Sequence, residues 1–331
     1  MNRRWLVAWL ALGGCDDEVV GFADSGSTDG EVAVSSSSET GALPGVSSSG
    51  STGGAAGLPD FVVYGLEAGL AASFDAGASW QMVDASVLEG FTQETMIAGP
   101  DGLLLAGGYV MASSPDGLSW TTHALDTSLG YVRHLASNGT RWVSVGLDHL
   151  AWSEDGISWT DARNDLEGFD MFEVAYGGGR FVALGFDTML TSTDGASWTK
   201  TGLGGSKLEA IAYANGRFVG LGEGGRIIVT ANGEDLLFNE ENVLPGLTGS
   251  VRACRGRFVA ASEGALFFSD DGQTWTETPA PSSGLVACSE DSVVTMQGQV
   301  THHGADALAL ASVFTFDGTV HALDYVGGVN E

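Results

Sequence analysis

The chain has 331 residues, enough for one large domain or two small ones. Its 50 glycines, 9 tryptophans and only 7 prolines are typical of an all-β repeat protein with many tight turns, and not of a helical one. A net charge of -29 argues against nucleic acid as a partner, because few cations are present to neutralise phosphates. The same charge argues against a basic patch that would hold the chain on an anionic membrane.

The first fifteen residues have the features of a bacterial export signal. Two arginines precede a short apolar run over residues 5–12, which is too short to span a bilayer because a spanning helix needs roughly 20 residues. The sequence Leu-Gly-Gly-Cys at 12–15 resembles the lipobox, in which a cysteine after small residues is acylated at the cleavage site. We therefore predict a lipoprotein signal peptide over 1–15 with Cys15 as the lipidation site. The alternative is an ordinary secretory signal with an unrelated cysteine.

Residues 16–57 consist mainly of Ser, Gly, Asp, Glu and Thr, with few large apolar side chains. Such a segment cannot bury enough surface to offset its ordering entropy, so we predict a disordered tether. A tether directly behind a lipid site is typical of a surface lipoprotein. This predicts a lipid-anchored protein of the bacterial cell envelope, periplasmic or on the outer surface, whose membrane contact is the lipid alone.

A turn motif recurs along the rest of the chain. Five copies contain a serine, an aspartate, a glycine, a hydroxyl residue and a tryptophan, and a sixth copy ends in leucine in place of tryptophan. The last residues of the copies lie at positions 80, 120, 159, 198, 236 and 275, so the period is 38 to 40 residues. The acidic or amide residues of the six copies are Asp75, Asp116, Asp155, Asp194, Asn232 and Asp271.

This motif resembles the Asp-box, or BNR, repeat, whose pattern is Ser-x-Asp-x-Gly-x-Thr-Trp. The copy over 73–80 matches it at full length, and the other four tryptophan copies are one residue shorter between Asp and Trp. Asp and Ser side chains bond to the backbone of such a turn, glycine supplies a positive φ, and tryptophan packs beneath it. In that family the box is a turn between the third and fourth strands of a propeller blade. The resemblance therefore implies that these aspartates are structural and not catalytic.

Two strand patterns recur with the motif, seven times each. One begins near residues 61, 103, 142, 181, 218, 258 and 293, and the strand before it contains residues 97, 135, 174, 211, 251, 286 and 323. About 39 residues with four short strands is the size of a propeller blade. The chain enters on a second strand at 61–65 and leaves on a first strand at 321–326, and pairing these two would remove two open edges.

We therefore predict that residues 58–331 form an all-β, seven-bladed β-propeller of four-stranded blades, with a C-terminal strand closing the first blade. The seventh copy of the turn motif has decayed to Thr301-His302-His303-Gly304, so its blade should be irregular.

Cys254 and Cys288 remain after the predicted lipid cysteine. In the repeat alignment Cys254 falls one place after Cys288, so their side chains point to opposite faces of their sheets. Because neighbouring blades pack with opposite faces together, the two cysteines can meet between blades six and seven. The alternatives are a disulfide, which suits an oxidising compartment, and two separate buried thiols.

The turn after each strand of the first pattern carries an acid in five of the seven units. These residues, Glu67, Asp148, Asp187, Glu223 and Glu263, are predicted to share one face at the mouth of the central channel. A ring of like charge would attract a basic or cationic ligand, although acidic turns are also the default in an acidic protein. Phe91, Tyr131, Phe169, Met171 and Phe172 lie beside the same loops, either as apolar anchors for a partner or as core.

Sialidases share only the box with this chain. Their site uses three arginines and a Tyr-Glu pair, whereas Arg180, Arg217 and Arg257 here recur at one place in successive units, as structural residues do. No metal motif is present, and the adjacent His302 and His303 would point to opposite faces of a strand. We therefore predict no catalytic residue, no metal and no cofactor.

A seven-bladed Asp-box ring is similar to photosystem II assembly factors, their bacterial relatives and the ligand-binding propeller of sortilin-type receptors. The resemblance implies a non-enzymatic platform that binds a protein or a glycan through its acidic face. The alternative is a carbohydrate-active hydrolase, sialidase-like or another glycosidase, because glycoside hydrolysis needs only two suitably spaced carboxylates.

Overall fold

A computed structural model describes residues 57–65, 69–84, 86–88, 95–99, 102–164, 166, 169–240, 243–244, 250–262, 265–279, 285–288, 293–297, 300–304, 312–315 and 322–325. The chain divides into two units, 1–50 and 51–331, and every described residue belongs to the second. The predicted signal with Cys15, and the predicted tether apart from Gly57, lie outside the described residues.

The described part of the chain contains strands and three short 3₁₀ turns, and no α-helix. These turns are η1 (Ser86–Leu88), η2 (Thr127–Leu129) and η3 (Glu223–Gly225). Consequently no described helix is long and apolar enough to cross a membrane.

Most of the strands form antiparallel sheets of four, each running in chain order except at the closure. The first sheet, in the order β26-β1-β2-β3, contains β26 (Ala322–Tyr325), β1 (Phe61–Gly65), β2 (Gly69–Ser73) and β3 (Gln81–Val83). The second contains β4 (Thr95–Gly99), β5 (Gly102–Gly107), β6 (Val110–Ser114) and β7 (Thr121–Ala124). The third contains β8 (Tyr131–Ser137), β9 (Trp142–Leu147), β10 (His149–Ser153) and β11 (Thr160–Asp161).

The later strands follow the same plan. A six-stranded sheet contains β12 (Met171–Gly177), β13 (Arg180–Ser192), β14 (Thr199–Ala214), β15 (Arg217–Gly222), β16 (Arg226–Thr230) and β17 (Leu236–Glu240). The next sheet contains β18 (Val251–Cys254), β19 (Arg257–Ser262), β20 (Ala265–Ser269) and β21 (Thr276–Pro279). The last contains β22 (Leu285–Cys288), β23 (Val293–Gln297), β24 (Val300–Gly304) and β25 (Ser312–Thr315).

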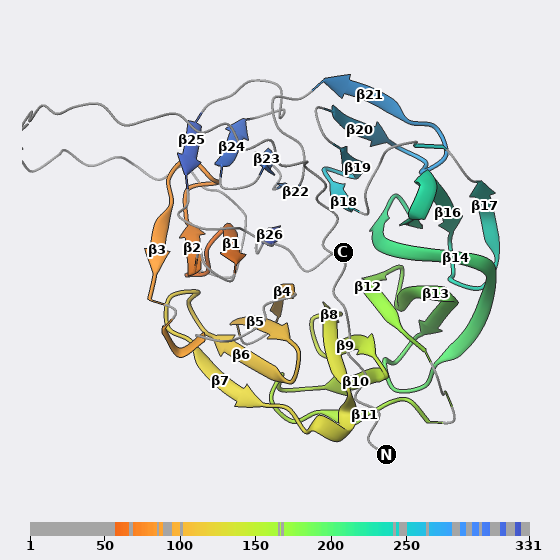
Figure 1. Cartoon of the computed structure of the whole chain (residues 1–331), viewed down its shortest axis with the longest axis horizontal. Helices are drawn as coiled ribbons and strands as arrows, with labels where there is room; N and C mark the ends of the chain where they lie inside the picture. Colours follow the sequence, from red (N-terminus) through yellow and green to blue (C-terminus); the bar gives the residue numbers. More distant parts are fainter. Residues whose placement is uncertain are drawn as a thin grey trace, which may run out of the picture. The chain divides into compact units, whose positions relative to one another are not determined.

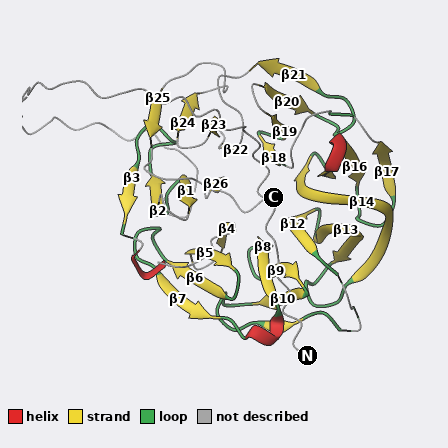
Figure 2. Ribbon diagram, viewed as in Figure 1, coloured by secondary structure: helices red, strands yellow, loops and turns green. Residues whose placement is uncertain are grey.

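The sheets of this unit stand around a common centre (Figure 1). The strands β4, β8, β12, β18, β22 and β26 lie innermost, and β3, β7, β11, β17, β21 and β25 lie at the periphery. Figure 2 shows that strands make up nearly all of the ring. The all-β class and the propeller arrangement expected from the sequence are therefore confirmed.

The expected seven separate sheets are not found as such, because hydrogen bonding joins the described strands into six sheets. The reason is the length of β14, whose residues 199–202 and 207 pair with β13 while residues 208–214 pair with β15. Figure 1 shows β14 running from the periphery towards the centre, so one continuous strand serves as the outer strand of one group and the inner strand of the next.

The closing strand is present where the sequence places it. Strand β26 pairs antiparallel with β1, and Phe61 lies opposite Tyr325. The first sheet is thus built from residues separated by nearly the whole length of the propeller unit, and the inner edge of β1 is covered.

The middle strands of the sheets form the core because both of their faces are covered by neighbouring sheets. Phe61, Phe181, Phe218 and Phe258 begin or nearly begin such strands and are each 0% exposed. Apolar clusters join neighbouring sheets, and one of them packs Val62 and Leu70 with Leu103. The Phe-Val pattern seen in the sequence is therefore the signature of a strand buried on both faces.

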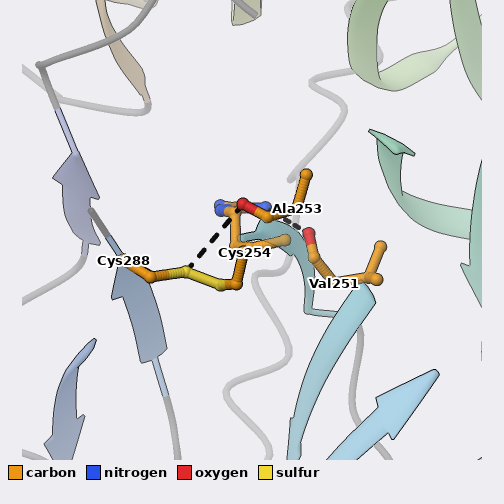
Figure 3. The surroundings of a disulfide bond; sticks show 5 residues. Val251, Ala253, Cys254 and Cys288 are labelled. Atoms are coloured by element: carbon orange, nitrogen blue, oxygen red, sulfur yellow. Dashed lines mark hydrogen bonds between the residues drawn. A yellow bond between two sulfur atoms is a disulfide. The ribbon is translucent and has the colours of Figure 1, made fainter. Parts of the chain in front are cut away.

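A disulfide joins Cys254 of β18 to Cys288 of β22, with a Cα–Cα distance of 5.6 Å (Figure 3). Both residues are buried, and both strands are the innermost of their sheets. Of the two alternatives left open by the sequence, the structure has the disulfide.

Candidate functional site

In each repeated turn, the aspartate or asparagine side chain accepts hydrogen bonds from the backbone of the same turn. In the copy around Asp116, Oδ1 accepts hydrogen bonds from the backbone N–H groups of Leu118 and Ser119, each at 2.8 Å. The Ser114 hydroxyl accepts from Gly117 N at 2.8 Å, and Trp120 Nε1 donates to Gly117 O at 3.2 Å. The backbone N–H groups at the two equivalent positions of the other turns donate to Oδ1 of Asp155, Asp194, Asp271 and Asn232.

These hydrogen bonds also fix the ionisation of the turn aspartates. Backbone donation from Ser119 is the largest influence on Asp116 and holds the pKa of its carboxyl below the usual value. The pKa of Asp155 is lowered in the same way by the backbone of Ser158. Carboxyls with such low pKa values remain ionised at neutral pH and are unsuited to donate a proton as a general acid.

Three of the five predicted ligand-face acids lie at the end of the sheets opposite to the repeated turns. Each inner strand begins at this end, and the turn between the second and third strands lies beside it, as the pairing of Tyr131 with Leu147 shows. We call this the mouth side. Asp148 and Asp187 lie exposed at two of these turns with φ values of 48° and 47°, and Glu223 is exposed in η3. Glu67 and Glu263 lie outside the described residues.

The mouth side is more apolar than the sequence indicated. Tyr109, Leu147 and Phe186 belong to these turns in three successive groups of strands and are 47%, 46% and 54% exposed. Tyr131 and Phe172 are half-buried, whereas Phe169 and Met171 are core residues. Phe91 lies outside the described residues.

These apolar residues are linked by ring contacts and by strand pairing. The Tyr109 ring meets the Tyr131 ring edge to face at 5.7 Å, and Tyr131 pairs with Leu147 across β8 and β9. Leu147 in turn forms a β-bridge with Asp170.

The strip continues on β12 and β13. The backbone N–H of Phe186 donates to Asp170 O at 3.3 Å, and the Phe186 ring meets Phe172 edge to face at 5.2 Å. Phe186 also pairs with Lys207 of β14. We call Tyr109, Tyr131, Leu147, Phe172 and Phe186 the mouth strip.

Two cations lie within the mouth strip and were missed by the sequence analysis. Arg133 Cζ lies 4.8 Å and Lys207 Nζ 4.5 Å from the centre of the Phe172 ring. Arg133 is ion-paired with Asp170, and Lys207 with Glu209. The sequence signal that could have revealed them is the scarcity of cations. The whole chain has only 13 Lys and Arg residues, and these two lie where inner strands begin.

Asp170 is a partly buried carboxyl of this surface. Partial burial raises its pKa, and the neighbouring Arg133 opposes that rise without cancelling it. The mouth side, as far as it is described, is therefore a mixed surface of aromatic rings and charges of both signs.

A second polar cluster lies in the central channel, in a cavity of about 170 Å³ lined by the inner strands. The buried Glu173 of β12 lies 3.1 Å from Nε2 of His134 and 2.9 Å from Nη1 of Arg252 through its Oε1. Its other oxygen accepts from Ile211 N at 2.7 Å. Nδ1 of His134 accepts from Val174 N at 3.4 Å, so the imidazole hydrogen facing Glu173 is on Nε2.

Glu173 is ionised despite its position. Burial raises its pKa, but Arg252 and, after it, His134 lower the pKa by more than burial raises it. The pKa of Glu173 therefore lies below the usual value. Both carboxylate oxygens have partners on other strands, so Glu173 cross-links the inner strands. We call this set of contacts the ionic tie. The sequence signal was a charged residue beside the recurring apolar position of an inner strand, at 134, 173 and 252.

Within the described residues, no group of three or more His, Cys, Asp or Glu side chains is placed to hold a metal ion. The described site therefore consists of an apolar and charged surface at the mouth side and a closed ionic tie in the channel.

No known protein family and no curated protein matches this sequence. Solved structures match its fold. YCF48 from Cyanidioschyzon merolae is 18% identical with a TM-score of 0.55, and the match covers 82% of this chain and 94% of that one. A structure of YCF48 bound to D1 peptide is 19% identical with a TM-score of 0.53, and the match covers 78% of this chain and 86% of that one.

PorZ, a surface component of the type-IX secretion system of Porphyromonas gingivalis, has a TM-score of 0.52 at 11% identity. That match covers 67% of this chain but only 33% of PorZ, so the chain spans about a third of its length. At these identities the likeness concerns the propeller fold.

Proposed function

We propose that this chain is a non-enzymatic, lipid-anchored protein of the bacterial cell envelope, which binds a protein or glycan partner at the mouth side of its propeller. Cys15 would carry the lipid and residues 16–57 would form the tether. The Cys254–Cys288 disulfide supports a location outside the cytoplasm, because disulfides persist in oxidising compartments.

The proposal includes a seven-bladed Asp-box propeller. Both β13 and β14 serve two neighbours along their length: residues 180–185 of β13 pair with β12 and residues 186–191 with β14, and β14 continues into its pairing with β15. Counting each of these two strands twice divides the six-stranded sheet into two groups of four. The hydrogen bonds that close the turns at Asp75, Asp116, Asp155, Asp194, Asn232 and Asp271 use the residues expected of an Asp-box. In this proposal those residues are structural.

The mouth strip is the observation that carries the binding role. Large apolar side chains from three successive groups of strands lie half-exposed at the same end of the sheets, beside paired charges. Continuous apolar patches rimmed by polar groups mark interaction surfaces on soluble domains. YCF48, which shares the fold, has been solved with a bound peptide, and this supports a peptide-binding role for a propeller of this kind.

A binding experiment on the full chain in detergent tests the proposal. Peptide and glycan panels are applied to wild type, Phe186→Ala and Ile157→Ala. Ile157 is the matched control, since it is 51% exposed but lies on a repeat turn at the opposite side of the ring. We expect a ligand whose binding is lost in Phe186→Ala and retained in Ile157→Ala.

An assay for released sugars accompanies the panels. Hydrolysis of a glycan by the wild type that stops in Asp187→Asn would favour the carbohydrate-active hydrolase and overturn the non-enzymatic function.

A further inference from the structure

The rings of the mouth strip are packed in pairs. Tyr109 packs edge to face with Tyr131, and Phe186 with Phe172. The Phe172 ring also has two cations over it, contributed by β8 and β14 on either side of β12. Tyr109, Leu147 and Phe186 nevertheless remain 47%, 46% and 54% exposed, which suits contact with aliphatic or aromatic side chains of a peptide.

The charges around the mouth strip have an acidic balance. Asp148, Asp187 and Glu223 are exposed at its turns, and Asp170 and Glu209 lie beside it. Partly exposed cations described on the same surface are Arg133, Lys207 and Arg163, and each forms an ion pair with a carboxylate of this chain. Carboxylates outnumber these cations, so the electrostatic potential of the surface favours an incoming basic group over an acidic one.

We infer that the mouth strip binds an extended peptide segment of a partner protein in which apolar side chains alternate with lysine or arginine. This inference rests on the proposed function and names the chemistry of its partner. The apolar side chains pack along Tyr109, Leu147 and Phe186, and the basic ones face Asp148 and Asp187. The anchors supply the affinity, and the carboxylates supply the preference for basic over acidic segments.

Fluorescence anisotropy with the full chain in detergent tests this inference. The probes are labelled decapeptides in which leucine and phenylalanine alternate with lysine in one series, glutamate in a second and serine in a third. At low salt we expect the lysine series to bind at least about tenfold more tightly than the glutamate series. The preference should shrink at high salt, since exposed charges are screened.

Matched variants separate the two contributions. Phe186→Ala and Tyr109→Ala should each weaken the lysine series about tenfold, and Ile157→Ala should leave it unchanged. Asp148→Asn with Asp187→Asn should lower the preference for lysine over glutamate and keep serine-series binding. Asparagine tolerates the left-handed backbone at both positions, so the turns should survive.

The failures are distinguishable. Equal binding of the lysine and glutamate series, or equal losses in Phe186→Ala and Ile157→Ala, would overturn the partner chemistry. If a glycan or an acidic peptide instead binds in a Phe186-dependent manner, this inference falls while the proposed binding function stands. Glycan turnover that depends on Asp187 would overturn both.

Discussion

A single carboxylate, Glu173, connects four inner strands of the propeller. It belongs to β12 and contacts His134 of β8, Ile211 of β14 and Arg252 of β18. Its side chain is only 8% exposed, whereas that of Arg252 is 32% exposed. The ionic tie is therefore partly screened at one end and protected from water at the other.

Replacing Glu173 by glutamine should lower the free energy of unfolding by about 2–3 kcal/mol, because Arg252 loses a buried counter-charge and His134 loses a charged hydrogen-bond acceptor. The control is Glu234→Gln, which disrupts an exposed ion pair with Arg180 at 3.6 Å and should cost less than about 0.5 kcal/mol. Urea denaturation of the three proteins measures both effects. Equal midpoints for Glu173→Gln and wild type would contradict the tie.

The stabilisation by Glu173 should depend on pH. Its pKa in the folded chain lies below the usual 4.5, so its contribution is present above pH 4.5 and is lost as the pH falls through the folded value. The difference in unfolding free energy between wild type and Glu173→Gln should therefore shrink as the pH falls below about 4.5. A difference that stays constant over that range would show that ionisation of Glu173 is not involved.

In the repeat turns, the stabilising effect of the side-chain hydrogen bonds can be separated from that of the negative charge. Asp271 Oδ1 accepts from Gln273 N and Thr274 N, and Asn232 makes the equivalent bonds with an amide oxygen. Asp271→Asn should therefore change the unfolding free energy by less than about 0.5 kcal/mol, and Asp271→Ala should lower it by about 1–2 kcal/mol. Thermal unfolding of both variants compares them, and equal losses would mean that the charge is what matters.

At the scale of strands, the repeating strands were predicted well from the sequence. The Phe-Val pattern located β1, β9, β13, β15 and β19, because a strand buried on both faces has a continuous apolar run. The continuity of β14 was not predictable, since nothing in its glycine-containing middle shows whether the hydrogen bonding continues or breaks.

The candidate site was only partly predictable for the same reason. Repetition revealed the turn acids Asp148 and Asp187, but Arg133, Lys207 and Glu173 each occur in one unit only. A residue that does not recur gives no periodic signal, and its partners come from other strands. The pairing of Cys254 with Cys288 also depended on how neighbouring sheets pack, which spacing alone left open.

The disulfide gives a prediction for the strands that it joins. Its cysteines are 34 residues apart, and a cross-link of that span is expected to stabilise by about 3–4 kcal/mol. The double change Cys254→Ala and Cys288→Ala should lower the denaturation midpoint, and reducing agent should lower that of the wild type but not of the variant. Thiol labelling of the unfolded protein before and after reduction checks the bond itself. A midpoint insensitive to both treatments would contradict the stabilising role.

For the whole molecule, the anchor is a separate prediction from the fold. Cys15→Ser should abolish incorporation of a labelled fatty acid and move the protein from the membrane to the soluble fraction. Cys288→Ala is the matched cysteine control and should retain both. Fatty-acid incorporation that persists in Cys15→Ser would place the lipid elsewhere or disprove the lipoprotein.

The pairing of β26 with β1 also bears on when the protein can fold. Phe61 gains its partner Tyr325 only after more than 260 further residues have been synthesised. Until then the ring stays open, and a chain that has not closed is easier to thread through a membrane channel than a finished domain. In the proposed export, the closing strand at residues 322–325 postpones completion of the ring until those residues have themselves been transported.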